Sequence, residues 1–75
     1  MTTKNQLIKM FDTDIAGATG LDRQDLEVVR GLIARTDDLA DPKAFMDAIR
    51  AHWTLAEQDA YVRASAWKRR QGRNA

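Results

Sequence analysis

The sequence predicts an all-α fold, a single small bundle of three to four short helices. Apolar residues recur at spacings of three and four, which places them on one side of a helix. The alternation of apolar and polar residues that marks half-buried strands is nearly absent. The length of 75 residues suits one small domain. We therefore expect one helical domain over residues 1–70 and a frayed basic tail at residues 71–75, which lack apolar anchors.

The first helix is expected near residues 4–16. Thr3 and Gln6 have the spacing of a capping box, in which two side chains bond to free backbone N–H groups at a helix start. One apolar stripe follows, made of Leu7, Ile8, Phe11 and Ile15. Gly17 and Gly20 then end the helix.

The second helix is expected near residues 23–35, with Asp22 as its N-cap and Asp25 in its first turn. Its buried face consists of Leu26, Val29, Leu32 and Ile33, with Val28 at the margin. Gly31 lies inside this pattern at a cost of about 1 kcal/mol relative to alanine. We interpret this glycine as allowing a neighbouring helix to approach closely. Residues 36–40 form a short polar connection.

The third helix is expected near residues 42–53. Asp41 can cap it, and the proline that follows suits the first helical position, where a backbone N–H has no partner. The inner face consists of Phe45, Met46, Ile49 and Trp53.

The fourth helix is expected near residues 55–70, because Thr54 and Glu57 repeat the capping-box spacing. Its apolar stripe consists of Ala60, Ala64 and Trp67, flanked by Tyr61. The main alternative is one continuous helix from Pro42 to about Arg70, since no glycine or further proline interrupts this stretch.

The composition excludes several classes of protein. Without cysteine there is no disulfide framework and no thiolate zinc site. His52 and Ser65 are the only residues of their types and are not positioned as a catalytic set, so we expect no enzyme and no cofactor. His52 has the simpler role of satisfying carbonyls at a helix end. The opening residues 1–5 lack the apolar stretch of a signal peptide, and no run reaches the roughly 20 apolar residues of a membrane span, so we expect a cytoplasmic protein.

Two groups of acidic residues could suggest metal binding. Residues 12–17 begin like an EF-hand calcium loop, but Ala16 and Arg23 occupy two positions that require oxygen ligands. We therefore interpret this run as a solvated helix end. The second group has the spacing of a solvated acidic face and consists of Asp37, Asp38, Asp41 and Asp47. We expect no metal site at either place.

The net charge of +1 conceals two opposite blocks. Residues 1–62 hold seven bases and eleven acids, a charge of −4, whereas residues 63–75 hold five bases and no acid. These bases are Arg63, Lys68, Arg69, Arg70 and Arg73. Cations at a helix C-terminus are stabilised by the helix dipole, which is one explanation. The other is an anionic partner.

The aromatic residues favour a protein partner. Tryptophan, tyrosine, methionine and arginine are enriched in the centres of interfaces. We expect Trp67 to be exposed in the basic turn as an anchor, or alternatively to cap the open end of the bundle; Trp53 is expected in the core.

The leading hypothesis is a small non-enzymatic protein–protein interaction module, a regulator or accessory subunit, whose partner is another protein or a second copy. No small-molecule substrate is expected. The predicted partner-binding residues are Tyr61, Arg63, Trp67, Lys68, Arg69, Arg70 and Arg73.

The alternative hypothesis is a nucleic-acid-binding protein that contacts phosphates through the basic fourth helix. In a helix-turn-helix the start of this helix would face the bases. Residues 55–59 contain two acids and no base, which argues against specific reading of the major groove.

Overall fold

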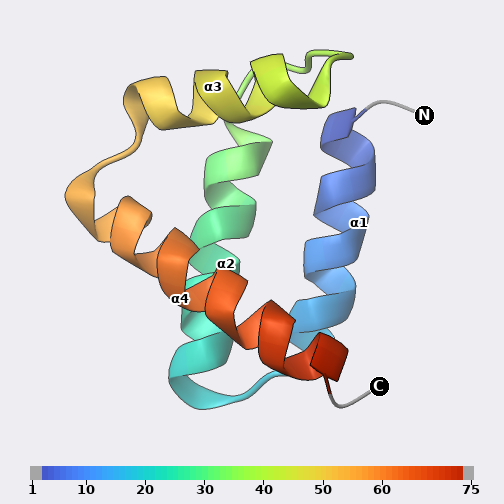
Figure 1. Ribbon diagram of the computed structural model, residues 1–75, viewed down its shortest axis with the longest axis vertical. Coiled ribbons are helices and arrows are strands. Elements are labelled where there is room, and N and C mark those ends of the chain that lie inside the picture. The colour runs from blue at the N-terminus through green and yellow to red at the C-terminus, as the bar shows by residue number, and fades with distance from the viewer. Residues whose placement is uncertain (1–2, 74–75) are drawn as a thin grey trace.

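The computed structural model describes residues 3–73, and four helices account for most of them (Figure 1). The helices are α1 (Thr3–Ala16), α2 (Gly20–Ala34), α3 (Pro42–His52) and α4 (Leu55–Arg73). This part of the chain contains no strand, so the predicted all-α bundle is confirmed. Helix α4 continues three residues past its predicted end. Residues 74–75 lie outside the described residues, and a frayed tail there stays a prediction.

Helices α1 and α2 form an antiparallel pair, α3 crosses one end of this pair, and α4 runs diagonally across α2 (Figure 1). The chain reverses between α1 and α2 at Gly17–Thr19. Gly20 has a φ of 61°, a left-handed conformation that favours glycine. The chain enters the helix directly from this residue, so α2 begins at Gly20 and not at the predicted residue 23.

The predicted caps of the first two helices are wrong. Thr19, in an extended conformation, precedes α2, so that Asp22 lies in the first turn instead of at the N-cap. At the start of α1, the Thr3 hydroxyl donates to the carbonyl of Ala40 at 3.0 Å. Thr3 therefore ties α1 to the connection before α3 instead of forming a capping box.

The predicted caps of the last two helices are confirmed. A carboxylate oxygen of Asp41 accepts from the Lys43 N–H at 3.3 Å. The Thr54 N–H donates to Oε1 of Glu57 at 2.8 Å, and the Glu57 N–H donates to the Thr54 hydroxyl at 3.2 Å. Trp53 has an extended backbone, with ψ of 152°. The continuous helix considered as an alternative is therefore wrong, because this capping box starts a separate helix.

The core forms one cluster between the helices, and the predicted apolar stripes are confirmed. Its buried members are Phe11, Ala18, Leu26, Val29, Leu32, Ile33, Phe45, Ile49, Ala60, Ala64 and Trp67. The interpretation of Gly31 is wrong, since a Cβ atom built there would meet no atom within 4 Å. Gly31 is exposed because it lies on the side of α2 away from its neighbours.

Candidate functional site

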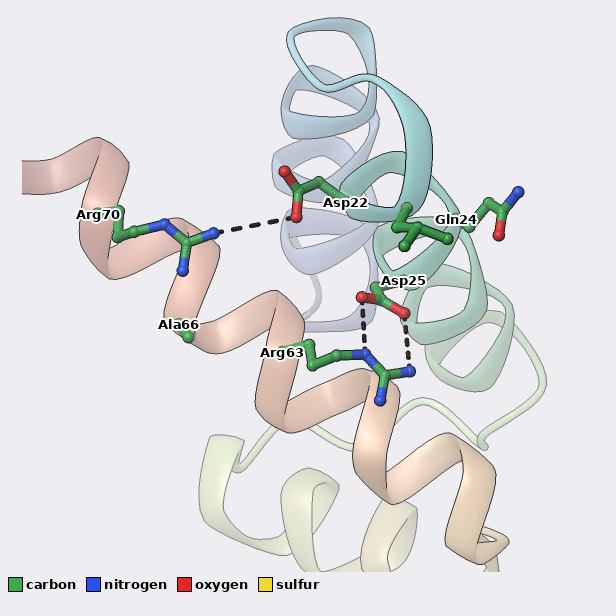
Figure 2. Close-up of a pocket in the computed structure, with 7 residues that line it drawn as sticks. Asp22, Gln24, Asp25, Arg63, Ala66 and Arg70 are labelled. Carbon is green, nitrogen blue, oxygen red and sulfur yellow. Dashed lines mark hydrogen bonds and ion pairs between the residues drawn. The ribbon is translucent and has the colours of Figure 1, made fainter.

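On the side of α4 that faces α2, the guanidinium of Arg63 is bonded to the carboxylate of Asp25 (Figure 2). Nε and Nη2 donate to the two carboxylate oxygens at 2.9 and 3.0 Å. The side chain of Asp25 is only 13% exposed, so this arginine is its principal compensation for burial. The hydrogen bonds that Arg63 donates to Asp25 raise the pKa of Arg63 further above its already high value. Arg63, predicted to bind a partner, is therefore already engaged within the chain.

Two turns further along α4, Arg70 lies 3.9 Å from Asp22 (Figure 2). This second pair is loose and solvent-exposed, so its contribution to stability is small. The two pairs line an open hollow of 580 Å³, which we call the α2–α4 hollow. It is lined by Leu21, Asp22, Gln24, Asp25, Arg63, Ala66 and Arg70. Because each base here faces an acid, the hollow offers little net charge to an anion.

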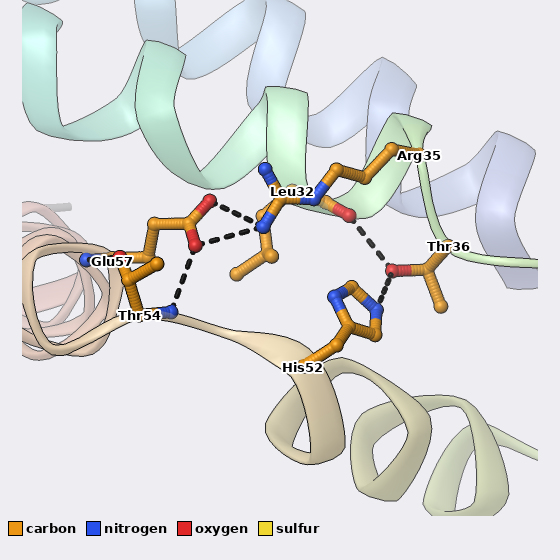
Figure 3. Close-up of polar contacts among 6 residues, drawn as sticks. All are labelled: Leu32, Arg35, Thr36, His52, Thr54 and Glu57. Carbon is orange, nitrogen blue, oxygen red and sulfur yellow. Dashed lines mark hydrogen bonds and ion pairs between the residues drawn. The ribbon is translucent and has the colours of Figure 1, made fainter.

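A third pair joins α2 and α4 at the opposite end of their contact, where Arg35 lies 2.6 Å from Glu57 (Figure 3). Glu57 also accepts the capping hydrogen bond from Thr54. The hydrogen bond from Arg35, followed by that from Thr54, lowers the pKa of Glu57 below its ordinary value of 4.5. Along the contact, the α4 members of the three ion pairs follow one another in the opposite order to their α2-side partners, which shows that α4 runs against the direction of α2.

His52 connects the end of α3 to the end of α2 (Figure 3). Its Nε2 lies 3.0 Å from the Thr36 hydroxyl, which itself donates to the Leu32 carbonyl at 2.8 Å. When the hydroxyl donates its single proton to the Leu32 carbonyl, the Nε2–H of His52 is the donor of the second bond. The expectation that His52 satisfies helix-end carbonyls directly is therefore wrong, because Thr36 bonds to the carbonyl and His52 bonds to Thr36.

A second hollow, the apolar pocket, opens on another side of α4, between α1, α3 and α4 with α2 as its floor. Its volume is 250 Å³. It is lined by Leu7, Phe11, Val29, Ile33, Met46, Ile49, Tyr61, Ser65 and Lys68. The three polar lining residues all come from α4 and are spaced by four and three, so they form one wall.

Lys68 and Tyr61 lie at opposite ends of this wall. The ammonium of Lys68 is 3.0 Å from Oδ2 of Asp14 and 4.4 Å from the centre of the Phe11 ring. This position combines an ion pair with a cation–π contact. The Tyr61 ring is 5.5 Å from that of Trp53, with the planes tilted by 55°. Lys68 is thus held by residues of α1, and Tyr61 contacts Trp53 in the break between α3 and α4.

The expected exposure of Trp67 is wrong, since only 8% of this residue is accessible. Trp67 lies on the same side of α4 as Ala60 and Ala64 because seven and three residues separate them. All three belong to the same buried core cluster. Trp67 is therefore a core residue and, in this structure, offers almost no surface to a partner.

The structure separates the other predicted partner-binding residues. Tyr61 and Lys68 line the apolar pocket, whereas Arg63 and Arg70 line the α2–α4 hollow. Arg69 is exposed and forms no ion pair with a described residue. The backbone of Arg73 ends α4, but its side chain lies outside the described residues. The basic block predicted from the sequence is thus largely divided between two sides of one helix.

Sequence reasoning missed the acids that receive these bases and the apolar wall that α3 contributes to the pocket. Asp25 could have been recognised, because it stands on the buried stripe of its helix, four residues before Val29 and seven before Leu32. A lone acid on such a stripe requires a base from another helix. No local signal identifies Asp14 as the partner of Lys68, since that contact depends on how α1 meets α4.

Within residues 3–73, no three acidic or histidine side chains gather as metal ligands, and residues 12–16, which resemble a calcium loop, belong to α1. In the same segment, no helix has both the length and the hydropathy needed to cross a membrane.

Comparison of the chain with protein-family models, with curated proteins and with solved structures gave no match.

Proposed function

We propose that this chain is a non-enzymatic, cytoplasmic protein-binding module that receives an amphipathic helix of a partner in its apolar pocket. The observation that carries the proposal is the pocket itself. A chain of 75 residues has few apolar side chains to spare. This chain nevertheless leaves three of them, Leu7, Met46 and Tyr61, only partly buried around a hollow whose deeper lining belongs to the core.

The lining of the pocket favours an apolar side chain as occupant. Phe11, Val29 and Ile49 form buried parts of the lining, and Leu7 and Met46 are partly buried. An inserted side chain would remove this apolar surface from water, at about 25 cal/mol per Å². The volume of 250 Å³ is below the roughly 300 to 1,000 Å³ of pockets that hold drug-sized ligands. The pocket therefore suits side chains of a partner helix better than a cofactor.

The charges around the pocket favour an acidic partner. Lys68 is part of the lining. Lys4 precedes the lining residue Leu7 by three positions, and Lys43 precedes the lining residue Met46 by three, a spacing at which residues are neighbours on a helix surface. These bases outnumber the neighbouring acid Asp14, which Lys68 already engages. Helix-in-groove binding uses apolar anchors every third or fourth residue, and acidic residues beside the anchors would complement these bases.

The test uses synthetic helical peptides of about 14 residues with leucines at helical spacing. One peptide carries glutamates on its polar face and a second carries lysines at the same positions. We expect the glutamate peptide to bind the wild-type protein, and the lysine peptide to bind at least about tenfold more weakly. Isothermal titration calorimetry measures both affinities.

Ser65→Phe is the decisive variant, because a ring on the α4 wall would fill the pocket without removing a core side chain. Ser65→Ala is its control at the same position, and Ala51→Phe places the same ring on an exposed part of α3. Binding should be lost in Ser65→Phe and kept in both controls. Equal binding by Ser65→Phe and wild type, or no binding of either peptide by wild type, would reject the proposal.

The nucleic-acid alternative stays a prediction with less support. Lys68, Arg63 and Arg70 are paired with acids of the same chain, so phosphates would have to compete for them. Retention on duplex DNA that falls steeply with salt, together with no binding of either peptide, would favour this alternative.

A further inference from the structure

The outward side of α4 carries a stripe of residues that are exposed except Ala66, which is partly buried and also lines the edge of the α2–α4 hollow. We call it the outer stripe; it consists of Leu55, Asp59, Val62, Ala66 and Arg69. The spacings of four, three, four and three are those of the seam between two helices of a coiled coil. Leu55 and Val62 are 80% and 57% exposed. Figure 1 shows α4 lying across α2 at the surface of the bundle, where a second helix could reach it.

The charges of the outer stripe are the ones that the fold leaves unused. Among the side chains of α4 that the structure describes, Asp59 and Arg69 are the charged groups without an ion pair in the chain. Asp59 acts on Arg63 only as a nearby charge, the least of the causes that raise the pKa of that arginine. The acid lies toward the start of α4 and the base toward its end.

We propose that the outer stripe binds the outer stripe of a second copy, with the two α4 helices antiparallel about a two-fold axis. The axis passes midway between Val62 and Ala66. In this register Asp59 of each copy faces Arg69 of the other, and Val62 of each copy faces Ala66 of the other. The two-fold axis makes every contact occur twice, as in an isologous dimer.

The order of charges selects a second copy as the occupant. Antiparallel pairing joins opposite charges at both ends of the seam, whereas parallel pairing would place acid beside acid and base beside base. The wall of the apolar pocket, formed by Tyr61, Ser65 and Lys68, lies on another side of α4. Self-association therefore leaves the apolar pocket of each copy open, and this inference is independent of the proposed function.

The expected affinity is modest. A seam built from one helix of each copy is smaller than the interfaces of permanent dimers, so we expect a Kd between about 1 µM and 1 mM. Sedimentation velocity over this concentration range tests for a monomer–dimer equilibrium in the wild-type protein.

Charge reversal tests the register. Asp59→Arg places base against base in its own dimer, and Arg69→Asp places acid against acid. The Kd for self-association of each variant alone should be at least about tenfold higher than that of wild type. An equimolar mixture of the two variants should recover association, because both charge pairs are then opposite again.

Asp37→Arg is the matched control, since it makes the same charge change at an exposed acid outside the outer stripe. It should associate like wild type, and so should Ser65→Phe, which separates this inference from that of the pocket. Circular dichroism checks that each variant keeps its helices. A wild-type protein that stays monomeric, a charge-reversal mixture that does not associate, or an equal loss in Asp37→Arg would overturn the proposal.

Discussion

Two neighbouring sides of α4 differ in how closely the next helix approaches. Toward α2 the helix presents Ala60 and Ala64, both buried, and the contact is closed there, while the α2–α4 hollow opens beside it. Toward α1 and α3 it presents Tyr61 and Ser65 at the very next positions, and there the apolar pocket remains open. Small side chains such as those of Ala60 and Ala64 let helix backbones approach, whereas the Tyr61 ring and the Lys68 side chain hold α4 away from α1 and α3. Residues that are adjacent in the sequence, 60 and 61 or 64 and 65, thus lie on the core side and on the pocket side of α4.

The largest expected effect comes from removing the side chain that completes the closed side. Trp67→Ala should lower the free energy of unfolding by about 3 to 5 kcal/mol, because it leaves a large cavity in the core. Urea unfolding followed by circular dichroism measures this change.

Trp53 provides the comparison for that variant. It is half-buried and stands beside Tyr61 at the edge of the pocket, so Trp53→Ala should cost less than Trp67→Ala. Equal losses for the two tryptophans, or a fully stable Trp67→Ala protein, would contradict the assignment of Trp67 to the core.

A pair of leucine substitutions at adjacent residues compares the two sides directly. Ala64→Leu should lower the free energy of unfolding by about 1 to 3 kcal/mol, since the contact with α2 has no room for a larger side chain. Ser65→Leu should change it by less than about 1 kcal/mol, since the new side chain enters the pocket. Unfolding in urea decides between these outcomes, and similar losses at the two positions would show that the pocket is not open in solution.

The smallest expected effect concerns pH at the end of the α2–α4 contact. The pKa of Glu57 is lower in the folded protein than its ordinary value, so the folded state binds fewer protons between these two pKa values. The stability that Glu57 supplies is therefore complete above about pH 5 and is lost as the pH falls through its folded pKa.

Glu57→Gln isolates this contribution from that of other carboxylates. The difference in unfolding free energy between wild type and variant, measured in urea at several pH values, should be largest near neutral pH and should shrink in acid. A difference that does not change with pH would show that the ion pair with Arg35 is not formed in solution.

Much of the fold follows from local signals in the sequence. The apolar stripes of all four helices are read correctly because helical periodicity is a local property. The capping box at Thr54 and Glu57 is likewise correct, since all of its atoms belong to neighbouring residues. The start of α2 is wrong because the left-handed conformation of Gly20 and the helix following it were not recognised.

The arrangement of charges is harder to read from the sequence. Summing the charges of residues 63–75 predicts a free basic end, but Arg63 and Lys68 meet acids that are 38 and 54 positions earlier in the chain. Those meetings depend on the direction in which α4 crosses α1 and α2. Opposite blocks of charge in one short chain can therefore pair with each other inside a single fold, and their separation along the sequence does not establish an external partner.

The two-residue break at Trp53–Thr54 makes α4 a separate helix, which bears on the order in which the helices dock during folding. Helices α1 and α2 are joined by a short turn and can pair locally, whereas α4 must close a loop of 38 residues to bring Arg63 to Asp25. We expect docking of α4 to be a late step. Since α4 supplies one wall of the pocket, an occupant that spans α4 and α1 would bind only after this step and would slow the departure of α4. Occupation of the pocket would thus lengthen the lifetime of the whole fold.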